Sequence, residues 1–205
     1  MRIVLTGFRG TGKTTTGRIL GARLGISFID TDQAIEERAG REIPAIFREQ
    51  GEPAFRELER QVITSLPADG VVVSAGGGAV LDPVNVARLR RGSLVFLLQA
   101  HEEVISRRIG GSERPSLTGR PPAEEAGELL RARRPAYLRA ADICIDTGDR
   151  SPEEVAGEIL RLRREGPGSA GSAAKGPVLF GRLPHPAGDR ELVPRILRGE
   201  EGNLA

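Results

Sequence analysis

The chain has 205 residues, 39% of them hydrophobic, and its 30 basic and 28 acidic residues leave a formal net charge of +2. This length suits one ordinary domain with some chain left over, and the near balance of charge, with 3% aromatic residues, argues against a nucleic-acid or membrane partner. The single cysteine, Cys144, excludes a disulfide within the chain, and an N-terminal apolar stretch too short for a signal peptide predicts a cytoplasmic protein.

Five short apolar runs predict the strands of a parallel sheet, at residues 3–6, 27–30, 71–74, 94–98 and 143–146. They lack the polar alternation of half-exposed strands, and the segments between them are long enough to contain helices. Gly25 and Gly40 mark two expected helix ends, and Pro152 marks the start of the last helix. We therefore expect an α/β fold of three layers, with a five-stranded parallel sheet between helices.

Residues 7–14 match the phosphate-binding motif G-x-x-x-x-G-K-[ST] and lie between a predicted strand and a predicted helix. The glycines of this motif let backbone N–H groups converge on phosphate oxygens at a helix N-terminus. Lys13 is expected to reach the β- and γ-phosphates of ATP, and the Thr14 hydroxyl to ligate Mg²⁺. The predicted nucleotide-binding residues of this loop are Gly10, Thr11, Gly12, Lys13, Thr14 and Thr15. The motif predicts the nucleotide but not the second substrate.

Two carboxylates, Asp30 and Asp32, follow the second predicted strand. In an open parallel sheet, ligands bind at that edge, and both side chains would share a face if the strand continued. A second interpretation stays open, in which Asp32 caps a helix that begins near Gln33. Arg56 lies on a helical pattern and a run of three glycines, 76–78, follows the third strand. Taken alone, these fit a surface charge and an ordinary turn as well as a substrate pocket.

Three later segments differ in composition from the rest of the chain. Residues 110–122, GGSERPSLTGRPP, show no apolar periodicity and predict a mobile lid. Residues 166–176, GPGSAGSAAKG, predict a flexible linker, and residues 177–205 are too short to fold alone, so that a disordered tail is expected. The folded domain is therefore predicted to span residues 1–165.

The motifs, taken together and in this order, resemble one family, the shikimate kinases. They are the phosphate-binding loop, F-x-D-T-D ending at Asp32, F-R-x-x-E ending at Glu59, the three glycines, R-P-x-L beginning at Arg114, and R-x-P-x-Y ending at Tyr137. The resemblance runs from Met1 to about residue 164. It implies an enzyme that transfers the γ-phosphoryl group of ATP, with Mg²⁺, to the 3-hydroxyl of shikimate in aromatic amino acid biosynthesis; we expect a monomer.

The resemblance assigns the metal and acceptor sites to particular residues. Asp30 would help to position Mg²⁺ beside Thr14, and Asp32 would orient the attacking hydroxyl, with its service as a general base left open. Arg56 and Arg133 would bind the shikimate carboxylate with their guanidinium groups. The remaining pocket residues would be Gly76, Gly77 and Gly78 through backbone N–H groups, Glu59 as a brace for Arg56, and the rings of Phe47 and Phe55, unless these rings are simply core.

For the nucleotide, the resemblance implies that Arg114 swings over the γ-phosphate as the lid closes. Arg108 would stack on the adenine, with Pro152 on the other side of the base. The expected catalytic residues are Lys13, Asp32 and Arg114.

Some points depart from the family pattern or stay open. Ser116 stands in the lid where the family has leucine, and Arg120 could supplement Arg114 there. Arg134 stands beside Arg133, although the spacing of the motif favours Arg133. Two other kinds of protein would share the phosphate-binding loop: another small-molecule P-loop kinase, and a nucleotide-binding module without catalysis. The carboxylates and arginines of the acceptor set argue against both.

Overall fold

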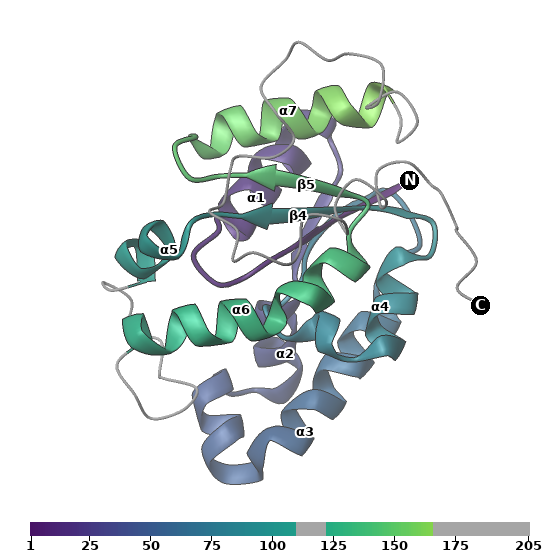
Figure 1. The fold of residues 1–205 in the computed structure, drawn as a ribbon. Coiled ribbons are helices and arrows are strands. Elements are labelled where there is room, and N and C mark those ends of the chain that lie inside the picture. Colours follow the sequence, from purple (N-terminus) through teal and green to yellow (C-terminus); the bar gives the residue numbers. More distant parts are fainter. Residues whose placement is uncertain (110–121, 166–205) are drawn as a thin grey trace, which may run out of the picture.

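The computed structural model describes residues 1–109 and 122–165, which fold around a five-stranded parallel sheet (Figure 1). The strands are β1 (Arg2–Thr6), β2 (Ser27–Asp30), β3 (Val71–Ser74), β4 (Ser93–Gln99) and β5 (Ile143–Asp146), and their order across the sheet is β2-β3-β1-β4-β5. The predicted strands are confirmed, with β1 and β4 slightly longer than expected. The predicted lid, apart from Pro122, and the predicted linker and tail lie outside the described residues.

The helices fill the connections as the sequence predicts. They are α1 (Lys13–Leu24), α2 (Thr31–Ala39), α3 (Ile43–Ser65), α4 (Pro83–Arg90), α5 (Glu102–Ile109), α6 (Pro122–Ala140) and α7 (Pro152–Glu165), with a 3-10 turn, η1 (Ala79–Leu81). Gly25 and Gly40 end α1 and α2 in the left-handed conformation, and Pro152 begins α7. Within residues 1–109 and 122–165, no helix combines the length and apolar content needed to cross a membrane.

Alternate side chains of the strands face the two sides of the sheet, and each side has its own helices. Ile3 and Leu5 of β1 pack with Leu20 of α1 and Ile159 of α7 in one core cluster. Val4, between them, belongs to a second cluster that includes residues of α3 and α4 on the opposite side. Figure 1 shows this arrangement, with α1 and α7 above the sheet and α3, α4 and α6 below it. The three-layer α/β prediction is therefore confirmed.

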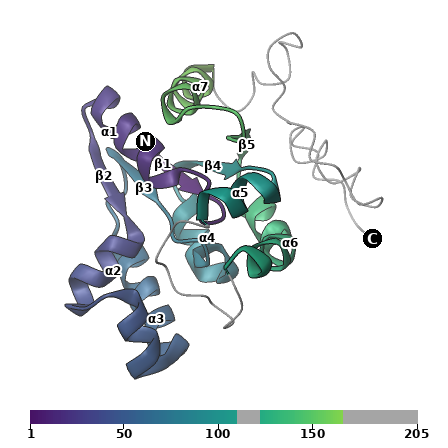
Figure 2. The same cartoon turned by 90° about the vertical axis from the view of Figure 1, so that its left-hand side faces the viewer.

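The pair α2 and α3 projects beyond the sheet (Figure 2) and has its own small core around Ile35 and Ile46. Helix α3 is kinked at Gly51, whose φ of 78° and ψ of 174° are open to glycine and strained for other residues. The kink brings Phe47 and Phe55, from the two halves of the helix, into contact with ring centroids 4.7 Å apart. This projecting pair forms one wall of the larger cavity described below.

Candidate active site

The phosphate-binding loop connects β1 to α1, and its backbone sets its shape. Gly7, with φ of 137°, passes so close to β4 that a Cβ atom there would lie 2.1 Å from the carbonyl oxygen of Leu98. At the other end of the loop, Gly12 caps α1. The first N–H groups of α1 have no partner within the helix, so this loop offers donors and a helix dipole to an anion.

The ammonium group of Lys13 is folded back on the loop. Its Nζ atom donates hydrogen bonds to the carbonyl oxygens of Gly7 at 2.8 Å and Phe8 at 2.9 Å. The hydroxyl of Thr11 also returns to the Phe8 carbonyl, at 2.8 Å. Thr11 therefore braces the loop with its side chain, and the ammonium group of Lys13 is held against the loop on a flexible stem.

A cavity of about 280 Å³, here called the nucleotide cavity, opens beside the loop. Among the nucleotide residues predicted from the sequence, those that line it are Gly10, Gly12, Lys13, Thr14, Thr15 and Arg108. Thr11 and Pro152 do not line it. Arg114, Ser116 and Arg120 lie outside the described residues.

Arg108 links two parts of the nucleotide cavity. Its guanidinium group donates to the carbonyl oxygen of Gly10 at 3.3 Å, and to those of Thr147 at 2.7 Å and Gly148 at 3.1 Å. The phosphate-binding loop is thereby tied to the segment that follows β5. Arg108 thus has a holding role that the sequence did not predict, in addition to its place on the cavity wall.

Asp30 and Asp32 are arranged differently from either sequence interpretation. The strand ends at Asp30, and α2 begins at Thr31, so the strand does not continue to Asp32. The helix cap is Asp30, whose Oδ1 atom accepts a hydrogen bond from the Asp32 N–H at 3.0 Å, and the prediction that Asp32 might be the cap was wrong. An aspartate side chain is a favourable N-cap, because it accepts a hydrogen bond from a free N–H group of the first helical turn. This explains why α2 begins at Thr31, earlier than the start expected near Gln33. Both aspartates nevertheless line both cavities of the site.

The Thr14 hydroxyl donates to the other carboxylate oxygen of Asp30, Oδ2, at 2.7 Å. Among the described residues, no group of three or more His, Cys, Asp or Glu side chains could hold a metal ion by itself. A hydroxyl and one carboxylate beside a phosphate site nevertheless suit Mg²⁺, which in such sites keeps water and takes phosphate oxygens as its other ligands. The donor set therefore fits the expected ion.

A second cavity, of about 610 Å³ and here called the acceptor cavity, lies between the loop and the projecting helices α2 and α3. Its wall includes five residues predicted for the acceptor, Asp32, Arg56, Gly77, Gly78 and Arg133, and both predicted rings, Phe47 and Phe55. Gly76 does not line it, and neither does Arg134. The fold thus brings together residues that lie about 100 positions apart in the sequence.

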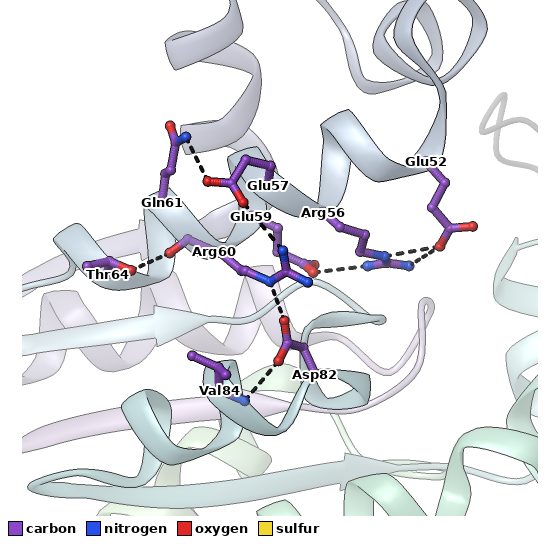
Figure 3. Close-up of polar contacts among 9 residues, drawn as sticks. All are labelled: Glu52, Arg56, Glu57, Glu59, Arg60, Gln61, Thr64, Asp82 and Val84. Carbon is purple, nitrogen blue, oxygen red and sulfur yellow. Dashed lines mark hydrogen bonds and ion pairs between the residues drawn. The ribbon is translucent and has the colours of Figure 1, made fainter.

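Arg56 is held between two glutamates of its own helix (Figure 3). Its Nε and Nη2 atoms donate to Glu52 Oε1 at 3.1 and 2.9 Å, and Nη1 donates to Glu59 Oε2 at 3.0 Å. The brace from Glu59 was predicted, and the one from Glu52 was not. One turn further along, Arg60 donates to Asp82 at 2.6 Å, which ties α3 to the cap of α4.

The carboxyl group of Glu59 is buried, with an exposed fraction of 1%. Burial raises its pKa, the guanidinium of Arg56 opposes that rise, and the nearby carboxylate of Asp32 adds to it. The pKa of Arg56 is raised in turn, because its two glutamates outweigh the effect of its burial. Arg56 therefore presents a fixed, permanently charged group to the cavity.

The three consecutive glycines make a tight turn in which most polar groups have partners. Gly76 donates its N–H to Thr31 Oγ1 at 2.8 Å, and the carbonyl oxygen of Gly77 accepts from the Tyr137 hydroxyl at 2.5 Å. The carbonyl oxygens of Gly76 and Gly78 accept from the first and last N–H groups of η1. Within the described residues, only the N–H groups of Gly77 and Gly78 in this turn lack a hydrogen-bond partner, and both residues line the acceptor cavity.

Close packing explains why the outer two positions of this turn are glycine. A Cβ atom at Gly76 would lie 2.4 Å from Asp32 Oδ1, and one at Gly78 would lie 2.6 Å from Arg56 Nη1. At Gly77 the nearest atom, the Tyr137 hydroxyl oxygen, would be 3.7 Å away. Gly76 therefore acts by leaving room for Asp32, rather than by lining the pocket.

Sequence reasoning also gave no role to Arg9 and Tyr137. Arg9 is the only basic residue, among those the structure describes, that lines both cavities, but the phosphate-binding motif leaves its position unspecified. Tyr137 was part of a quoted motif without a role, and its partner Gly77 is 60 residues away. Neither contact leaves a local signal in the sequence.

The phosphate-binding loop follows a strand of a parallel sheet, with a hydroxyl and a carboxylate beside it, and a cavity for a second substrate adjoins it. These features define a P-loop kinase of small molecules. Comparison with known proteins identifies the family of kinases to which the chain belongs. A family model described as "Shikimate kinase" matches residues 9–163. The chain belongs to the shikimate kinase family and is an ATP-dependent phosphotransferase with an alcohol acceptor.

Individual relatives agree with this assignment. The chain is 45% identical over 151 residues to a shikimate kinase of Caldanaerobacter subterraneus subsp. tengcongensis, covering 73% of this chain and 88% of the relative. It is 48% identical over 147 residues to that of Moorella thermoacetica, covering 71% and 84%. A shikimate kinase from Acinetobacter baumannii, solved in complex with shikimate, superimposes with a TM-score of 0.76 at 34% identity, covering 80% of this chain and 93% of that one.

Proposed function

We propose that this protein transfers the γ-phosphoryl group of Mg-ATP to the 3-hydroxyl of shikimate, giving shikimate 3-phosphate and ADP. One observation carries the proposal: the two cavities share a wall. The residues that line both are Arg9, Thr14, Asp30, Asp32 and Gly77. An acceptor hydroxyl in the larger cavity would therefore face the terminal phosphate of a nucleotide in the smaller one, as in-line transfer requires.

On the nucleotide side, the loop N–H groups and Lys13 would hold the phosphates, and Arg108, which lines the cavity, would border the base. Pro152 does not line the cavity, and its place beside the base follows from the family match alone. Thr14 and Asp30 would hold Mg²⁺, which, when bound, supplies positive charge at the phosphate oxygens. The 2.7 Å contact between the Thr14 hydroxyl and Asp30 supports this pairing. Arg114, by its family match alone, would complete the site over the γ-phosphate.

On the acceptor side, the carboxylate of shikimate would be bound by Arg56, Arg133 and the N–H groups of Gly77 and Gly78. What supports this is that two guanidinium groups, and two N–H groups without a partner among the described residues, border one cavity. The Acinetobacter relative is a complex with shikimate, which favours the same ligand for this chain. The rings of Phe47 and Phe55 would cover the apolar face of the sugar-like ring.

The transfer step assigns the central role to Asp32. The 3-oxygen of shikimate forms a bond to the γ-phosphorus, the bond from that phosphorus to the bridging oxygen of ADP breaks, and the hydroxyl proton passes to Asp32. Asp32 lines both cavities, and Gly76 leaves room for its carboxylate. A carboxylate within hydrogen-bond reach can align the hydroxyl even before the proton moves.

We also propose that the protein acts as a monomer in the cytoplasm. Residues of a single copy line two cavities that share a wall, which supports a transfer within one subunit. Burial raises the pKa of Cys144 to about 11, so this thiol stays protonated, as suits a protein with no disulfide to form. Sedimentation of the full chain tests the monomer, and a sedimenting dimer would contradict it.

The function is tested by an ADP-release assay with Mg-ATP, in which shikimate, gluconate and several nucleoside monophosphates are compared at equal concentration. Only shikimate is expected to support turnover. The matched control is the Asp32→Asn protein purified in the same way, which excludes a contaminating kinase. Turnover with another acceptor in place of shikimate would contradict the proposal, and so would the absence of turnover with every acceptor.

A further inference from the structure

Tyr137 lies behind the acceptor cavity, on α6, and touches no position that a substrate would occupy. Its side chain has an exposed fraction of 1%, and it is not among the described residues that line either cavity. Its hydroxyl donates a hydrogen bond of 2.5 Å to the carbonyl oxygen of Gly77. We propose that Tyr137 is a positioning residue that sets the affinity for the carboxylate of the acceptor, an inference that rests on the proposed function.

The first step of the argument is the geometry of one peptide bond. The carbonyl of Gly77 and the N–H of Gly78 belong to the same planar trans peptide, so they point in opposite directions. A hydrogen bond that holds the carbonyl on Tyr137 therefore directs the N–H of Gly78 away from α6. Between two glycines this peptide is the least restrained by side chains and the easiest to rotate. The Tyr137 hydroxyl is the side-chain group that fixes it.

The second step concerns what else Tyr137 touches. Arg133 lies one helical turn earlier on α6, four residues away, which places the two side chains on the same face. Burial raises the pKa of Tyr137 to about 12, and the charge and hydrogen bond of Arg133 oppose that rise. The phenol therefore remains a protonated donor at neutral pH. One hydroxyl thus contacts both the glycine turn and an arginine proposed to bind the same carboxylate.

The third step is that the phosphate-binding loop also lies close to Gly77. A Cβ atom at Gly77 would lie 3.8 Å from both the Gly7 carbonyl oxygen and the Arg9 nitrogen, in ordinary contact. Gly77 thus lies close to the loop as well as to Tyr137. Removing the hydroxyl leaves the loop contacts in place, so the effect should fall on the acceptor and not on the nucleotide.

The kinetic test is Tyr137→Phe, which removes only the hydroxyl. Loss of one buried hydrogen bond predicts a KM for shikimate raised about tenfold, with the KM for ATP changed less than about twofold. The control is Ser65→Ala, which removes another hydroxyl bonded to a backbone carbonyl, that of Val62 at 2.9 Å, far from both cavities, and should change neither constant. An unchanged KM for shikimate, or an equal rise for both substrates, would overturn the inference.

A second measurement does not depend on how well that variant folds. The chain has one tyrosine and no tryptophan, so its tyrosine emission reports on Tyr137 alone. Shikimate should change this emission in a saturable way, and its methyl ester, which lacks the anionic carboxylate, should not. If the tyrosine emission does not change on addition of shikimate, although the enzyme phosphorylates shikimate, the inference is overturned and the proposed function is not affected. If the wild-type protein does not turn over shikimate at all, both are refuted.

Discussion

The two halves of the active site are built in different ways. The nucleotide half is centred on one continuous segment, residues 7–15, which supplies six of the lining residues. Other segments add Asp30, Asp32, Ser74, Ala75, Gly77, Arg108 and Ile109. The acceptor half draws Asp32 from α2, Arg56 from α3, Gly78 from the turn after β3 and Arg133 from α6. The centre of the first half is therefore visible in the sequence as one motif, whereas the second half is assembled entirely from separate segments when the chain folds.

The difference extends to what holds each half in place. The loop is braced by contacts within itself, such as those of Lys13 and Thr11 with the Phe8 carbonyl. The acceptor groups need supports from elsewhere: Glu52 and Glu59 fix Arg56, and Tyr137 fixes the glycine turn. Substitutions in the acceptor half should consequently weaken the binding of the acceptor while the affinity for ATP is retained.

The largest effect is expected at the shared wall, where the two halves must act together. Asp32→Asn keeps the shape of the side chain but removes the carboxylate proposed to receive the proton, so kcat should fall about 10²- to 10⁴-fold. The dissociation constant for ATP, measured by calorimetry, should stay within about twofold of the wild-type value. Weakened ATP binding would instead place Asp32 functionally in the nucleotide half.

Thr14→Val tests the nucleotide half through its proposed Mg²⁺ site. It removes the hydroxyl that meets Asp30 at 2.7 Å, and with it one proposed Mg²⁺ ligand. The Mg²⁺ concentration for half-maximal activity should rise about 10- to 100-fold, by analogy with other losses around metal ligands. Shikimate binding, followed by tyrosine emission without nucleotide, should be unchanged. A change there would mean that the halves are not separable at this residue.

The glycine turn sharpens the comparison within the acceptor half, because its three positions should respond differently to alanine. Gly78→Ala pushes the Arg56 guanidinium aside and should raise the KM for shikimate about tenfold. Gly76→Ala displaces Asp32 and should mainly lower kcat. Gly77→Ala keeps the N–H group and meets only ordinary contacts, so it should have the smallest effect of the three. Equal effects of all three would show that the turn fails as a unit.

The smallest effect is expected from Asp82, which supports α3 from outside the cavity. Hydrogen bonding from Arg60 lowers the pKa of Asp82 below its ordinary 3.8. A lowered pKa means that this contribution to stability is fully present above about pH 4 and is lost as the pH falls through the native pKa. Asp82→Asn should therefore lower the melting temperature at pH 7 by only about 2 °C, because Arg60 is exposed and Asp82 is only partly buried.

The same measurement at lower pH completes that test. Protonation of Asp82 in the wild type should bring the two melting temperatures together below about pH 4. A difference that persists in acid would show that the helix cap, rather than the charge, carries the effect. In either case the KM for ATP should be unaffected.

How far the sequence predicted the molecule depends on the range of the interactions. The strands were predicted because an apolar run of four or five residues is a local signal, and so was the phosphate-binding loop. The helix cap at Asp30 was missed, since a strand that ends on a carboxylate and one that continues for two more residues look alike in composition. The Thr31–Gly76 and Tyr137–Gly77 hydrogen bonds join residues 45 and 60 apart, and no local pattern encodes them.

The wall shared by the two cavities also bears on inhibitor chemistry. A molecule that joins a phosphate chain to a small hydroxylated acid across Arg9, Thr14 and Asp32 would occupy both cavities at once. It would lose its translational freedom once instead of twice, so its affinity should exceed that of either fragment by orders of magnitude. The linker would need to be no longer than the phosphoryl group that normally crosses there. For such a joined ligand, the two cavities form a single binding site.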